Sequence, residues 1–187
     1  MNNNKVWEGI LIKQLNSRLS GAAAKNVKIV GVRFIWPADL EFKGVQTELL
    51  VKKAVYIVKS DLSINTDLSQ KKILFKISNA SVKADTMNIN DISSNWTIFI
   101  DPVSAEGTIG APTMVINGNK FSSLNAEMLY DKNVLTISTM AVRGYNGIIS
   151  GEGKIHGKQD YNLKLAFEQL EIEQLKKANA YAFSFFK

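Results

Sequence analysis

The amino-acid sequence predicts a mainly β protein, with a long antiparallel curved sheet that is groove-like or sandwich-like, one N-terminal amphipathic helix and a short C-terminal helix. Apolar residues recur about every four positions only near the start of the chain, as in a helix. Further on they alternate with polar residues, which is the period of a strand. Glycine, asparagine and aspartate interrupt this alternation at short intervals, as in antiparallel hairpins. We therefore expect a single β domain over residues 1–187.

The helix is expected over about residues 5–20. Its apolar stripe is widened by Val6, Ile10 and Ile12, and Gly21 follows it as a helix-ending residue. Few basic residues share the helix, which favours docking of the stripe on the core over contact with a membrane surface. The stripe itself recurs every four residues and consists of Trp7, Leu11, Leu15 and Leu19.

Roughly nine or ten strands are expected after the helix. Short strands and turns are expected between residues 107 and 118, where three glycines and a proline lie. A short helix is expected over 170–177. The remaining alternating segments predict strands over 27–35 with a bulge at Gly31, 40–42 closed by Gly44, 54–64, 73–84 with a bulge at 78–79, 96–100 stopped by Asp101, 124–130, 134–137, 148–155 and 161–167.

Two short helices cannot cover so large a sheet. Each strand offers an apolar side, and exposing it to water costs about 25 cal/mol for every Å². The sheet therefore either folds onto itself as a sandwich or curls into a trough whose wall binds apolar ligands. The strand periodicity alone favours the sandwich but is compatible with both.

Composition excludes several classes of function. The chain has no cysteine, which excludes disulfides, thiolate metal sites and cysteine nucleophiles, and it has a single histidine, His156. We therefore expect no metal, no cofactor and no enzymatic activity. The net charge of +6 suits an anionic partner, but the lysines are dispersed, which disfavours nucleic-acid binding. Gly151 and Gly153 do not form a phosphate loop, because Ile148 and Ile155 stand where such a loop needs glycine and serine or threonine.

The second half of the chain carries an ordered series of features. Phe121, Leu124 and Ala126 lead through Met128 and Tyr130 into a turn, followed by Val134, Leu135 and Ile137, then Met140 to Val142, the turn Gly144-Tyr145-Asn146-Gly147, and Ile149 to Gly151. Leu163, Leu165 and Phe167 follow, with Leu170, Ile172 and Leu175 after them. This series resembles the AsmA-like and TamB-like proteins of Gram-negative envelopes, and is also similar to the type II secretion protein N.

The resemblance implies a non-catalytic periplasmic module that binds or conducts lipid between envelope membranes along an apolar β groove. It implies a phospholipid or other acyl-chain ligand, and a longer protein tethered to the inner membrane by a segment absent from this chain. The stripe of Trp7, Leu11, Leu15 and Leu19 becomes a membrane-proximal helix. The residues expected to line the groove are Trp96, Ile98, Ile100, Leu124, Met128, Leu135, Ile137, Leu163, Leu165 and Phe167.

An alternative function comes from the same strands. A closed sheet with unpaired edges would serve as a structural or assembly module of the envelope or of a secretion system. Its partners would be envelope proteins or further copies of the chain, bound by strand pairing. Whether the apolar side is open to an acyl chain distinguishes the two hypotheses.

Overall fold

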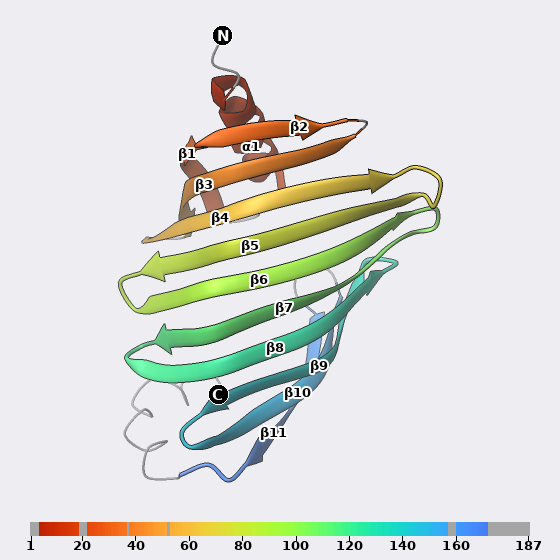
Figure 1. Cartoon of the computed structure of the whole chain (residues 1–187). Coiled ribbons are helices and arrows are strands. Elements are labelled where there is room, and N and C mark those ends of the chain that lie inside the picture. The colour runs from red at the N-terminus through yellow and green to blue at the C-terminus, as the bar shows by residue number, and fades with distance from the viewer. Residues whose placement is uncertain (1–3, 19–21, 37, 52, 157–159, 172–187) are drawn as a thin grey trace.

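A computed structural model describes residues 4–18, 22–36, 38–51, 53–156 and 160–171. In these residues one helix, α1, accompanies a single sheet of eleven strands (Figure 1). The elements are α1 Asn4–Arg18, β1 Ala22–Lys28, β2 Gly31–Ile35, β3 Asp39–Val51, β4 Ala54–Asp67, β5 Lys72–Ala84, β6 Met87–Ile100, β7 Val103–Ile116, β8 Asn119–Asp131, β9 Val134–Gly144, β10 Gly147–His156 and β11 Asp160–Glu168.

The sheet is an antiparallel meander. Each strand from β3 to β10 pairs with the next strand in the chain, while β1 and β2 both pair with β3 and together form one edge. The prediction of a mainly β, antiparallel fold is confirmed. The described residues form one open sheet, so the predicted sandwich is not what they build. Figure 1 shows a curved sheet with α1 behind its N-terminal strands.

The predicted helix is confirmed over Asn4–Arg18, and Leu19 lies outside the described residues. Trp7 packs edge-on against Phe42, with ring centroids 5.5 Å apart and an interplanar angle of 79°. The predicted widening of the stripe is wrong for Val6 and Ile10, which are 62% and 42% exposed. The helix packs instead through Trp7, Leu11, Ile12 and Leu15 on a core of Val27, Ile29, Phe42 and Val45.

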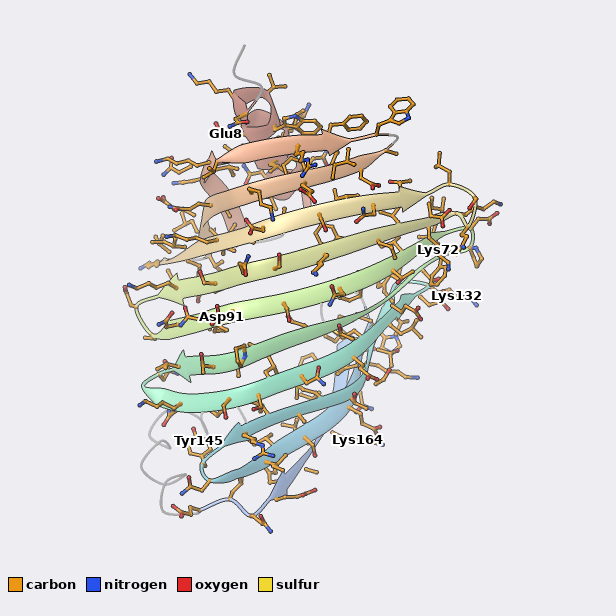
Figure 2. All side chains as sticks on the ribbon, viewed as in Figure 1. Glu8, Lys72, Asp91, Lys132, Tyr145 and Lys164 are labelled. Atoms are coloured by element: carbon orange, nitrogen blue, oxygen red, sulfur yellow. The ribbon has the colours of Figure 1, made fainter. Side chains whose placement is uncertain are left out.

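Polar side chains of α1 also bond to the backbone beside it. Asn16 accepts from the Ala24 N–H at 2.7 Å and donates to the Ala24 carbonyl at 3.2 Å. Glu8, labelled in Figure 2, accepts from the Ile29 N–H at 2.9 Å, and Asn4 donates to the Ile29 carbonyl at 3.2 Å. Free backbone groups on an edge strand invite pairing with other chains, and α1 satisfies such groups at Ala24 in β1 and at Ile29 directly after it.

Three strand predictions and one helix prediction need correction. The single strand predicted over 27–35 with a bulge at Gly31 is two strands, because β1 ends at Lys28 and β2 begins at Gly31. β3 continues through Gly44, which has a positive φ of 59° and forms a bulge instead of closing the strand. The turns predicted between 107 and 118 are wrong up to Ile116, because β7 is one continuous strand through Gly107, Gly110 and Pro112. Leu170 and Glu171 are not helical, and the rest of the helix predicted over 170–177 lies outside the described residues.

Bulges keep one side of each long strand apolar along its length. The predicted bulge at 78–79 is confirmed by the positive φ of Asn79, 51°, and by a shift in the β4–β5 register. Asp61 on β4 lies between two bulges: its carboxylate accepts from the Gly44 N–H at 2.8 Å and from the Asn79 amide at 3.0 Å. These bonds, with a smaller contribution from Lys43, lower the pKa of Asp61.

Candidate functional site

The candidate site is the face of the sheet against which α1 packs, here called the apolar face. In an antiparallel sheet, directly paired residues point to the same side, so the register traces rows across the strands. The first row begins at Ile64, which packs against the α1 core. It continues strand by strand through Phe75, Trp96, Gly107, Met128, Ile137 and Gly153 to Leu163 on β11.

Two flanking rows have the same character. One runs from Leu62 through Ile77, Ser94, Ile109, Ala126, Met140 and Gly151 to Leu165. The other runs from Thr66 through Ile73, Ile98, Ala105, Tyr130, Leu135 and Ile155 to Tyr161. None of the three rows, which cross β4 to β11, contains a charged residue.

The register therefore brings together the residues predicted from the sequence to line a groove. Six of them, Trp96, Ile98, Met128, Leu135, Ile137 and Leu163, lie in the first and third rows, and Leu165 lies in the second. The two-residue period places Ile100, Leu124 and Phe167 on the same face, beside Ile98, Ala126 and Leu165. They form one surface, but their role in lipid binding stays a prediction.

The charges of the sheet lie on the opposite face. One row there runs from Asn65 through Leu74, Thr97, Glu106, Leu129, Thr136 and Lys154 to Asn162. In Figure 2, where α1 lies behind the sheet, this opposite face is turned to the viewer and bears Lys164. The Lys164 ammonium and the Glu152 carboxylate, 3.3 Å apart, form an ion pair on it.

The apolar face is covered at one end and exposed at the other. Leu62 and Ile64 pack against the core beneath α1. Trp96, Met128 and Ile137 are half-buried in the middle of the sheet. On β11 the exposed fraction reaches 47% for Leu163 and 58% for Phe167. Within the described residues, therefore, no second layer covers the C-terminal half of this face.

Trp96 occupies the centre of the apolar face, and its polar atom is satisfied there. The indole N–H donates to the Ser94 hydroxyl at 2.8 Å, and that hydroxyl donates to the Thr108 carbonyl at 2.8 Å. The ring lies over Gly107, where an added Cβ would come within 2.6 Å of the indole Cε3 atom. The sequence pattern did not indicate a role for Ser94, and it predicted that Gly107 lies in a turn. The cross-strand pairing of Gly107 with Trp96 shows instead that this glycine leaves room for the indole ring.

Two hollows lie elsewhere. One, of about 700 Å³, is lined mainly by opposite-face residues such as Asn65, Lys76 and Glu106. The other, of about 800 Å³, lies beside the β9–β10 turn. Polar residues outnumber apolar ones in both linings, and most of the residues around the first hollow belong to the opposite face, so neither is the apolar groove predicted from the sequence.

The described residues hold no group of three or more histidines, cysteines, aspartates or glutamates placed to bind a metal ion. No helix within them has the length and apolar character needed to cross a bilayer. No protein-family model, curated protein or solved structure matches the chain. The resemblance to AsmA-like envelope proteins therefore stays a prediction from sequence.

Proposed function

We propose that this protein is a non-catalytic module that binds lipid acyl chains along its apolar face. The supporting observation is the set of three uncharged rows that cross β4 to β11 and are exposed towards β11. Through the resemblance to AsmA-like proteins, the proposal extends to lipid conduction between the membranes of a Gram-negative envelope. It also extends to a periplasmic location and an inner-membrane tether outside this chain.

The physical reason is the cost of exposing hydrocarbon to water. Each methylene moved from water to an apolar surface contributes about 0.8 kcal/mol, so an uninterrupted wall without charges favours an acyl chain at every point along it. A lysine or glutamate in one of the rows would lose hydration under a bound chain, which opposes binding.

The dimensions of the face suit such a ligand. Neighbouring strands are about 4.8 Å apart, so the six spacings from β5 to β11 span about 29 Å. An acyl chain in one leaflet occupies about half of a hydrocarbon core that is about 30 Å thick. The exposed part of the apolar face is therefore long enough for a whole chain lying across the strands.

The test is retention of phospholipid by the purified protein, measured by native mass spectrometry, together with uptake of a fluorescent fatty acid. Leu163→Glu places a carboxylate on the apolar face at a residue that is already 47% exposed, so the sheet can tolerate it. Asn162→Glu is the matched control, because it adds the same charge to the neighbouring residue on the opposite face. We expect Leu163→Glu to lose lipid and Asn162→Glu to retain it.

Two results would overturn the proposal. One is a wild-type protein that is free of lipid and takes up no fatty acid. The other is equal binding by Leu163→Glu and Asn162→Glu when circular dichroism shows both to be folded. Leu135→Glu, paired with Thr136→Glu on the opposite face, repeats the comparison on β9.

Assembly by strand pairing is the second candidate function. Within the described part of the chain, β11 pairs with β10 alone, and all nine of its residues are exposed. An edge of this length offers backbone groups to an added strand. If the protein acts in this way, lipid-free protein should associate as its concentration rises, as measured by analytical ultracentrifugation. A protein that stays monomeric at all concentrations would argue against pairing between copies of the chain.

A further inference from the structure

The hairpin turns at one end of the strands carry exposed apolar side chains. Because the sheet is an antiparallel meander, the turns that join β2 to β3, β4 to β5 and β6 to β7 lie at the same end of the strands, on the right in Figure 1. Trp36 directly follows β2, Leu68 directly follows β4, and Val103 is the first residue of β7. Their side chains are 83%, 74% and 68% exposed. We call Trp36, Leu68 and Val103 the apolar tips.

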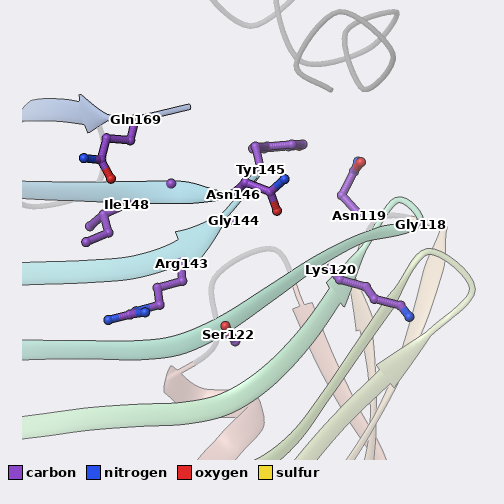
Figure 3. Close-up of a pocket in the computed structure, with 11 residues that line it drawn as sticks. Gly118, Asn119, Lys120, Ser122, Arg143, Gly144, Tyr145, Asn146, Ile148 and Gln169 are labelled. Atoms are coloured by element: carbon purple, nitrogen blue, oxygen red, sulfur yellow. The ribbon is translucent and has the colours of Figure 1, made fainter. Parts of the chain in front are cut away.

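The turns at the other end of the strands are polar. Of the large apolar residues beside them in the described chain, Val55 alone is more than half exposed, at 51%. Figure 3 shows one of these turns, from β9 to β10, with Tyr145 and Asn146. The described residues between the strands at this end are Lys53, Asp85, Thr86, Asn117, Gly118, Tyr145 and Asn146. Exposed apolar side chains at the turns are therefore concentrated at one end of the sheet.

The apolar tips stop at β7. The next turn at their end of the sheet joins β8 to β9 through Lys132 and Asn133, and Lys132 is labelled in Figure 2. Neighbouring strands are about 4.8 Å apart, so consecutive tips are two spacings, or about 10 Å, from each other. The three tips therefore extend over about 20 Å of this end of the sheet.

The acidic side chains at these three turns already have hydrogen-bond donors. The Asp39 carboxylate accepts from two donors of β4, and the Asp67 carboxylate accepts from the Gln70 N–H at 3.1 Å. Asp101 pairs with Lys71, with 3.1 Å between the carboxylate and the ammonium. An apolar surface that contacts the tips therefore leaves each of these carboxylates with a partner, and an unpartnered carboxylate would oppose such a contact.

The apolar face reaches the apolar tips. Phe34 pairs with Leu40, which pairs with Ile64 of the first row, so Phe34 lies on that face. Ile100, on the same face, pairs directly with Val103. Phe34 and Ile100 are 58% and 43% exposed. The surface proposed to bind acyl chains is thus continuous with this end of the sheet.

A lipid bilayer is the partner that suits separate apolar tips of this kind. Tryptophan is enriched at the boundary between headgroups and hydrocarbon, because its ring is amphipathic. Leucine and valine gain free energy when they leave water for the same boundary. A protein partner would need a packed and continuous contact surface, whereas tips about 10 Å apart can enter a bilayer one by one. Two lysines, Lys71 and Lys72, against three aspartates give these turns a net charge of −1, so attraction to anionic lipid is not expected.

We propose that Trp36, Leu68 and Val103 insert into the interface of a lipid bilayer and hold the protein at its surface. The proposal goes beyond acyl-chain binding, because this contact does not require that a lipid leave the membrane. A lipid that does leave the bilayer at the tips would meet Phe34 and Ile100 on the apolar face.

The test is co-sedimentation of the full chain with phosphatidylcholine vesicles at about 0.15 M salt, where exposed charges more than about 8 Å apart are largely screened. Leu68→Ser and Val103→Ser each remove an apolar tip. Val55→Ser is the matched control, because it makes the same change as Val103→Ser at an exposed valine of the other end. All three side chains are exposed, so we expect the variants to fold, which circular dichroism checks.

We expect Leu68→Ser to weaken vesicle binding about tenfold and Val103→Ser about fivefold, because each variant loses the burial of an apolar side chain. Val55→Ser should bind as the wild type does. Addition of phosphatidylglycerol to the vesicles should change the binding of the wild type little.

Tryptophan fluorescence gives a second readout. Trp7 packs on Phe42 and Trp96 lies over Gly107, so Trp36 is the one of the three tryptophans that lies at the tips. We expect phosphatidylcholine with brominated acyl chains to quench the emission of the bound protein. Trp36→Phe, which keeps an aromatic ring at this position, should bind vesicles but lose most of that quenching.

Three results would overturn the proposal. The first is a wild type that does not bind phosphatidylcholine vesicles, or equal weakening by Val55→Ser and Val103→Ser. The second is binding that needs phosphatidylglycerol and disappears as salt is added, which would assign the contact to charge. The third is a Leu68→Ser variant that keeps vesicle binding but loses association between copies of the chain, which would make the tips a protein interface.

Leu163→Glu separates this site from acyl-chain binding. We expect this variant to lose fatty-acid uptake and keep vesicle binding, and Val103→Ser to keep fatty-acid uptake with weaker vesicle binding. Loss of vesicle binding by Leu163→Glu would show that the apolar face holds the protein at the bilayer, which would also overturn the proposal. A wild type that binds vesicles but takes up no fatty acid would overturn the acyl-chain proposal alone.

Discussion

The close contact of Trp96 with Gly107 gives the sharpest test of how the apolar face is packed. We consider the substitution Gly107→Ala on β7. An alanine Cβ at this position would lie 2.6 Å from the indole Cε3 atom and 2.7 Å from the Asn95 carbonyl oxygen. Both separations are shorter than van der Waals contact allows. The indole therefore has to move, and the paired backbone of β6 at Asn95 has to shift as well.

The expected cost follows from three terms. Overpacking a site of this kind costs about 1 to 3 kcal/mol, and displacing the indole N–H from the Ser94 hydroxyl costs about 1 kcal/mol more. Replacing glycine with alanine lowers the conformational entropy of the unfolded chain, which raises the free energy of unfolding by about 0.4 to 1 kcal/mol. We expect Gly107→Ala to lower the free energy of unfolding by about 1 to 3.6 kcal/mol.

Gly110→Ala on the same strand is the matched control. Its Cβ would lie 3.5 Å from both the Leu124 carbonyl oxygen and the Ser93 hydroxyl, which is ordinary contact. We expect this variant to gain about 0.4 to 1 kcal/mol from the unfolded state alone. Urea unfolding followed by far-ultraviolet circular dichroism measures both variants. Equal stability of the two would refute the packing of Trp96 on Gly107, whereas rescue of Gly107→Ala by Trp96→Leu would support it.

Two further predictions concern other parts of the fold. The folded-state pKa of Asp61 lies below the usual value of 3.8, so its stabilising contribution is complete above that pH and is lost as the pH falls through the lowered pKa. The wild type should therefore unfold at a lower urea concentration below about pH 4 than at neutral pH. The difference in free energy of unfolding between the wild type and Asp61→Asn should also shrink below that pH. A difference that does not depend on pH would contradict the hydrogen bonds described for Asp61. Trp7→Ala should lower the free energy of unfolding by about 2 to 4 kcal/mol, measured by thermal unfolding, because the indole packs on Phe42. The control Val6→Ala, at a side chain that is 62% exposed, should change that free energy by less than about 0.5 kcal/mol. Similar effects of the two substitutions would show that α1 docks differently.

Much of the local structure could be predicted from the residue pattern. Alternation at Trp96, Ile98 and Ile100 predicted a strand, and the residues assigned to a groove from four segments of sequence do share one face. The prediction failed where glycine and proline were taken as ends of strands. Gly107 fits inside β7 because the indole of a residue eleven positions earlier fills its space, and no local pattern reports that neighbour.

The hollow at the β9–β10 turn could not be predicted from the sequence either. Lys120 and Arg143 are 23 positions apart in the chain, and only the pairing of β8 with β9 makes them neighbours.

Amino-acid order alone was enough to establish that this chain forms antiparallel strands, each with one side free of charge, because the period of two is a property of the backbone itself. It was not enough to choose between a closed sandwich and an open sheet. Alternation records which side of a strand is apolar but carries no information about what lies against that side. That choice depends on contacts between distant segments, and in the described structure those contacts bring α1 over the first strands and leave the apolar face of the last strands exposed.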